Sequence, residues 1–116
     1  MGQMVRILIA DDQPHYRHLV SKSLCEEGYQ TKIVDNADSA WEHLKGFQPD
    51  IMLLHALSEG FDSFALLLEI KQVEPDFPVL VYVIQSRDAL DRLKESITSI
   101  LEDNRSVESC IQSALV

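Results

Sequence analysis

The chain has 116 residues, which is the size of one domain. Ten lysine and arginine residues stand against nineteen aspartate and glutamate residues, so the formal net charge is −9. Scattered cations in so acidic a chain argue against binding of nucleic acid or of an anionic membrane. The apolar stretches are too short to span a bilayer, and two cysteines make no disulfide framework. We therefore expect a single domain over residues 1–116 in the reducing cytoplasm.

Short apolar runs alternate with amphipathic segments along the whole chain. The apolar runs predict five strands, at residues 5–10, 29–34, 51–54, 79–84 and 99–101. The remaining segments carry apolar residues at helical spacing and predict five helices, which begin near Pro14, Asn36 or Asp38, Phe64, Ser86 and Ser106. The last helix would carry Ala114 and Leu115. This alternation is typical of an α/β fold, a doubly wound parallel sheet with helices on both faces.

Polar residues follow several of the predicted strands, and ligand sites in such sheets lie at the carboxyl ends of the strands. Asp11 and Asp12 follow the first strand, and His55 follows the third. Residues 84–86 and Asp103 follow the fourth and fifth strands. Because these ends meet at one edge of the sheet, we expect polar groups from separate parts of the chain to converge there.

Four segments carry a resemblance to a known family: residues 7–12 (ILIADD), 49–54 (PDIMLL), 60–62 (GFD) and 77–79 (FPV). In this order and at these intervals, they resemble the receiver domain of bacterial response regulators. The resemblance implies a flavodoxin-like sheet with strand order 2-1-3-4-5. It also implies a phosphorylation switch in two-component or phosphorelay signalling. In that switch an acidic pair holds Mg²⁺ and an aspartate at the end of the third strand accepts the phosphoryl group.

Carried over residue by residue, the resemblance places the acidic pair at Asp11 and Asp12. The phosphoacceptor position falls on His55, and the position of the phosphate-binding hydroxyl falls on Val83. The switch aromatic falls on Ile100, and the phosphate-binding lysine falls on Asp103. These departures remove the carboxylate nucleophile, a hydrogen-bond donor and the cation that phosphoryl transfer to a receiver needs. We therefore predict a degenerate receiver, a pseudo-receiver that acts independently of phosphorylation.

Three interpretations of His55 beside the two aspartates stay open. As an imidazolium, which nearby carboxylates favour, it would lock the pocket without a metal ion. As a neutral imidazole, it would join Asp11 and Asp12 as a ligand of a transition metal. In the third interpretation the aspartates only end a strand and cap a helix, and His55 has no task. We expect no cofactor, with Mg²⁺ on Asp11 and Asp12 as the alternative.

Motifs of enzymes are missing from the sequence: there is no phosphate-binding glycine loop and no Gly-x-Ser-x-Gly segment. We therefore expect a signalling module and not an enzyme, with a protein partner: a histidine kinase, an output domain or a second copy of the chain. Two alternatives stay open. One is a phosphorylatable receiver with a non-standard acceptor at Asp50, Asp62 or His55, and the other is a small flavodoxin-like protein that binds a metal or another ligand.

Overall fold

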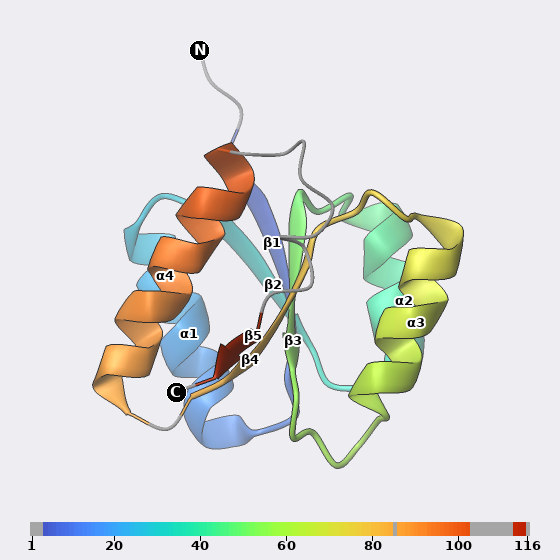
Figure 1. The fold of residues 1–116 in the computed structure, drawn as a ribbon, viewed down its shortest axis with the longest axis horizontal. Coiled ribbons are helices and arrows are strands. Elements are labelled where there is room, and N and C mark those ends of the chain that lie inside the picture. Colours follow the sequence, from blue (N-terminus) through green and yellow to red (C-terminus); the bar gives the residue numbers. More distant parts are fainter. Residues whose placement is uncertain (1–3, 85, 103–112, 116) are drawn as a thin grey trace.

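The fold is a parallel sheet between two layers of helices, in a computed structural model that describes residues 4–84, 86–102 and 113–115 (Figure 1). Within these residues, five strands pair in the order β2-β1-β3-β4-β5, which confirms the predicted fold class and strand order. The strands are β1 (Arg6–Ala10), β2 (Gln30–Val34), β3 (Ile51–His55), β4 (Val79–Val83) and β5 (Ser113–Leu115). The helices are α1 (Pro14–Glu26), α2 (Ala37–Gly46), α3 (Ser63–Val73) and α4 (Arg87–Glu102).

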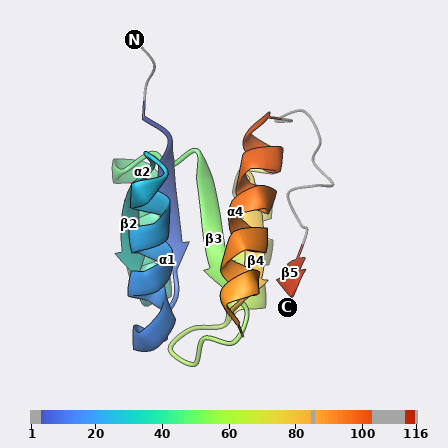
Figure 2. The same ribbon diagram turned by 90° about the vertical axis from the view of Figure 1, so that its left-hand side faces the viewer.

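The core is divided by the sheet into two layers. Successive residues of a strand point to opposite faces. Ile7 and Ile9 of β1 therefore pack with α1 and α4, whereas Leu8 and Ala10 pack with α2 and α3. Figure 2 shows α1 and α4 side by side on one face of the sheet. Every residue of β3 and β4 is buried, as continuous apolar runs predict for strands that are covered on both faces.

Helix ends follow local signals that the sequence carries. The side chain of Asn36 accepts a hydrogen bond from the Ser39 N–H at 2.8 Å and caps α2, so Asn36 is the cap and Asp38 lies inside the helix. The segment after α1 turns at Gly28, whose φ of 95° lies in the left-handed region that favours glycine. No helix in the described residues is long and apolar enough to cross a membrane.

The predictions for the C-terminal part were wrong in two respects. Residues 99–101 do not form the fifth strand, because they continue α4 to Glu102. Leu93, Ile97 and Ile100 are buried at helical spacing, and this stripe decides the structure over the short run Ser-Ile-Leu. The fifth strand is instead Ser113–Leu115, so Ala114 and Leu115 do not belong to a last helix. Ser106, its predicted start, lies outside the described residues.

Candidate functional site

Three side chains from the ends of β1 and β3 meet at the carboxyl edge of the sheet: Asp11, Asp12 and His55. Each offers a ligand atom, and these atoms all lie within 4.8 Å of one another. The parallel register puts Ala10 beside Leu54, so the residues that follow are neighbours. Asp11 and His55 are buried and Asp12 is partly exposed. The predicted convergence is therefore present, and we call these three residues the Asp–His pocket.

Asp11 is held from the core side by Tyr82 of β4. The Tyr82 hydroxyl donates a hydrogen bond to Asp11 Oδ2, and the Gln13 N–H donates one to Oδ1 at 2.8 Å. Tyr82 is fully buried, and its ring packs edge-on against the His55 ring at a centroid distance of 5.4 Å. Burial, then the charge of Asp11 and the hydrogen bond to it, raises the pKa of Tyr82 well above its usual value. The hydroxyl thus stays protonated and keeps its role as donor.

Asp12 is held by the loop between β3 and α3. Its Oδ2 accepts hydrogen bonds from the N–H groups of Glu59 at 2.9 Å and Gly60 at 2.5 Å, and Gln13 Nε2 donates to Oδ1 at 3.1 Å. Burial opposes ionisation of Asp12, but the hydrogen bonds outweigh it and hold the pKa of this carboxyl below its usual value. The ionised carboxylate therefore fastens the loop to the end of β1.

An acid-dependence experiment tests this role of Asp12. A lowered pKa in the folded state contributes stability above the unfolded-state value of 3.8, and this stability is lost as the pH falls through the folded-state pKa. We expect Asp12→Asn to be less stable than the native chain at pH 7 and the difference to shrink at pH 3. Urea unfolding at both pH values measures it. Asp76→Asn, at an exposed loop residue, is the control, and an equal pH dependence in both variants would contradict the assignment.

His55 is anchored by two serines. Ser63 Oγ donates a hydrogen bond to the His55 carbonyl oxygen at 2.6 Å, and Ser58 Oγ lies 3.4 Å from His55 Nδ1. Ser58 Oγ also accepts from the Asp12 N–H at 3.4 Å. The same imidazole Nδ1 lies 3.8 Å from Asp11 Oδ1. The ring thus lies beside Asp11, and Ser58 connects the loop after β3 to both His55 and Asp12.

Close packing at Gly60 offers a test of the loop. A Cβ at this position would lie 3.1 Å from Asp12 Oδ2 and 3.3 Å from the Asp35 carbonyl oxygen. We expect Gly60→Ala to lower the free energy of unfolding by about 1–2 kcal/mol, because two polar neighbours must shift. At Gly46 a Cβ would meet no atom within 4 Å, so Gly46→Ala serves as the control in the same thermal melts. Equal melting temperatures for the two variants would show that the loop is not closely packed.

Two other predicted site residues, Val83 and Ile100, lie outside this cluster. Val83 ends β4 and is buried, and its apolar side chain donates no hydrogen bond. Ile100 lies on α4 and not on a fifth strand, so its assignment as the switch position was wrong. Asp103 lies outside the described residues.

The sequence analysis missed the groups that orient the pocket. Tyr82 was counted only as an apolar strand residue, although a tyrosine is the one polar side chain in the run VLVYV and could have been noted on that ground. The donors from Glu59 and Gly60 are backbone N–H groups, which leave no signature in side-chain types.

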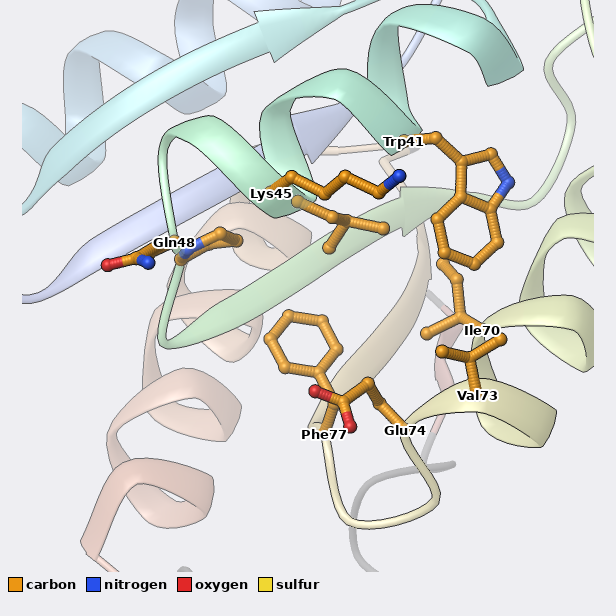
Figure 3. A pocket seen from close by; sticks show the side chains of 9 residues that line it. Trp41, Lys45, Gln48, Ile70, Val73, Glu74 and Phe77 are labelled. Atoms are coloured by element: carbon orange, nitrogen blue, oxygen red, sulfur yellow. The ribbon is translucent and has the colours of Figure 1, made fainter.

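A groove lies at the opposite, amino edge of the sheet. It occupies about 510 Å³ between α2 and α3 and is lined mainly by apolar side chains, including Trp41, Ile70 and Phe77 (Figure 3). Trp41 is half-buried there. Gln48 and Pro49, just before β3, close one end of the groove. The groove is therefore separate from the Asp–His pocket.

A family model, curated proteins and solved structures all match this chain. Residues 7–112 match the family model of the response regulator receiver domain. The chain is 32% identical over 80 residues to the DNA-binding transcriptional regulator NtrC of Rhizobium meliloti, a match that covers 69% of this chain and 16% of that protein. It is 31% identical over 91 residues to sporulation initiation phosphotransferase F of Bacillus subtilis, covering 78% of this chain and 72% of that one. A crystal structure of NtrX from Brucella abortus with ADP superposes with a TM-score of 0.79 at 27% identity, covering 89% of this chain and 28% of NtrX.

Proposed function

Because this chain belongs to the response regulator receiver domain family, we propose that it is a phosphorylation-independent signalling module of a two-component or phosphorelay system. The observation that supports this most directly is the buried imidazole of His55 at the end of β3, beside Asp11 and Asp12. We take this as the phosphoacceptor position, where a working receiver carries a carboxylate. The module acts by binding a protein and not as an enzyme.

The chemistry of the pocket supports this proposal. Phosphoryl transfer to a receiver depends on positioning and on neutralisation of the charge of the phosphoryl group. A phosphoryl donor would meet two carboxylates here, and Val83 supplies no hydroxyl. The other candidate acceptors have structural tasks: Asp50 accepts from the Arg6 N–H at 2.8 Å, and Asp62 caps α3 by accepting from the Ala65 N–H at 3.1 Å.

Mg²⁺, the ion that the family implies, does not fit this donor set. Mg²⁺ requires near-octahedral coordination by oxygen atoms. One of the three side chains offers a nitrogen, so these donors do not supply the all-oxygen coordination that Mg²⁺ requires. We therefore assign no step to Mg²⁺ in this pocket.

The partner in this proposal is a protein: a histidine kinase, an output domain or a second copy of the chain. The chain spans about one sixth of the NtrC proteins that it matches and 43% of the heme response regulator HssR of Staphylococcus saprophyticus. Nucleic acid is not proposed as a ligand of this domain, because its net charge of −9 repels phosphates.

Incubation with acetyl phosphate and Mg²⁺ tests the proposal. We expect the intact mass at neutral pH to stay unchanged, because the pocket offers a phosphoryl group no carboxylate nucleophile at the end of β3 and no fitting Mg²⁺ site. A phosphorylatable receiver treated in parallel shows that the reagent is active. A phosphoryl adduct on this chain would overturn the proposal, and mapping it to His55, Asp50 or Asp62 would identify the acceptor.

A further inference from the structure

The contacts within the Asp–His pocket are too long for hydrogen bonds and suit a shared ion. His55 Nδ1 and Asp11 Oδ1 are 3.8 Å apart, whereas a charge-assisted hydrogen bond between them would be about 2.7–2.9 Å. Ligands that each lie about 2.0–2.2 Å from one ion are about 3–4 Å from one another. The donor atoms of Asp11, Asp12 and His55, all within 4.8 Å, need only a small contraction to reach that spacing.

The carboxylates are also oriented as metal ligands are. Tyr82 donates to Asp11 Oδ2, and the N–H groups of Glu59 and Gly60 donate to Asp12 Oδ2. In metal sites such hydrogen bonds fix the direction of each ligand and are needed for affinity. Asp11 is shielded from water and from dissolved ions, because its exposed fraction is 0%. Its negative charge is therefore stabilised most by a cation in direct contact with it.

The chemistry of the donors selects the class of ion. Imidazole nitrogen suits Zn²⁺ and the late first-row divalent ions, whereas Mg²⁺ requires oxygen. A neutral His55 with two carboxylates balances the charge of one divalent ion. We propose that Asp11, Asp12 and His55 form a binding site for Zn²⁺ or a similar late first-row ion, in preference to Mg²⁺. This metal site replaces the interpretation of His55 as an imidazolium that locks the pocket. Such a lock needs a short hydrogen bond, but His55 Nδ1 and Asp11 Oδ1 are 3.8 Å apart.

Calorimetric titration of the metal-stripped chain with ZnCl₂ and MgCl₂ tests this proposal. We expect one Zn²⁺ per chain, bound more tightly than Mg²⁺. His55→Ala should weaken Zn²⁺ binding at least about tenfold because it removes a ligand, and Tyr82→Phe should weaken it about 10–100-fold through Asp11. His55→Asp should reverse the preference toward Mg²⁺, because all three donors are then oxygen.

Other metal-binding groups in the chain provide the controls. His15 and His18 are exposed three residues apart on α1, and Cys25 is an exposed thiol. Zn²⁺ binding should persist in the His15→Ala/His18→Ala and Cys25→Ser variants. Loss of binding there, unchanged binding in His55→Ala, or tighter binding of Mg²⁺ would overturn the proposal.

A measurement on the native chain removes any dependence on the folding of the variants. The ring nitrogen of His55 that binds the ion should change its ¹⁵N chemical shift on addition of Zn²⁺, and an unchanged His55 signal at saturating Zn²⁺ would contradict the site. This inference concerns the same pocket as the proposed function, but the two fail separately. A phosphoryl adduct would overturn phosphorylation independence but not the zinc site. Absence of Zn²⁺ binding would overturn the zinc site but not phosphorylation independence.

Discussion

Replacing Tyr82 with phenylalanine should lower the free energy of unfolding by about 1.5–3 kcal/mol at neutral pH, because the buried Asp11 carboxylate loses a donor. The ring itself keeps its packing in the core, so the change isolates the hydroxyl. Urea unfolding of both chains at pH 7 measures the difference. Tyr16→Phe, at an exposed position on α1, is the matched control and should leave stability unchanged.

The pH dependence of the Tyr82→Phe effect has a definite sign. The pKa of Tyr82 is raised above its unfolded-state value of 10.0. Its contribution to stability is therefore fully present below pH 10 and is lost as the pH rises through the folded-state pKa. The native chain should lose more stability than the variant in strongly alkaline solution. A constant difference between the two chains across that range would show that the hydroxyl is not the group responsible.

Leu53→Ala should cost about 2–5 kcal/mol, because Leu53 is fully buried at the centre of β3 and its removal leaves a cavity in the layer under α1 and α4. Denaturant unfolding measures this loss. Leu68→Ala provides a control of identical chemistry, since Leu68 is 64% exposed on α3 and should change stability by less than about 0.5 kcal/mol. Equal losses in the two variants would contradict the assignment of the two side chains to core and surface.

The sheet was predictable because the sequences of its central strands are continuous runs of apolar residues. Residues 51–54 and 79–84 are bounded by turns and polar residues, and no helical stripe competes with them. The strand prediction for residues 99–101 failed because the segment Ser-Ile-Leu satisfies two patterns at once, a short strand and the continuation of the helical stripe that includes Ile97. A local run carries no information about the neighbour that a helix will cover, so the packing of α4 decided between the two patterns.

The pocket was predictable only as far as strand ends define it. Asp11, Asp12 and His55 follow β1 and β3, and parallel pairing brings such residues together whatever their role. The groups that orient them come from the next-to-last residue of β4 and from a loop backbone. Tyr82 reaches Asp11 although β3 lies between β4 and β1. The side-chain pattern of one strand does not reveal which residues face it across the sheet.

Tyr82 belongs to two parts of the molecule at once. Its ring packs in the layer that includes Leu93 of α4, and its hydroxyl holds Asp11. A change in the packing of α4 that moved this ring would therefore be coupled to the pocket, and such coupling is reciprocal. A protein that moved this ring by docking against α4 would alter the affinity of the pocket for the proposed ion, and the ion would alter the affinity of α4 for that protein by the same factor. Communication between the two surfaces then needs no covalent modification.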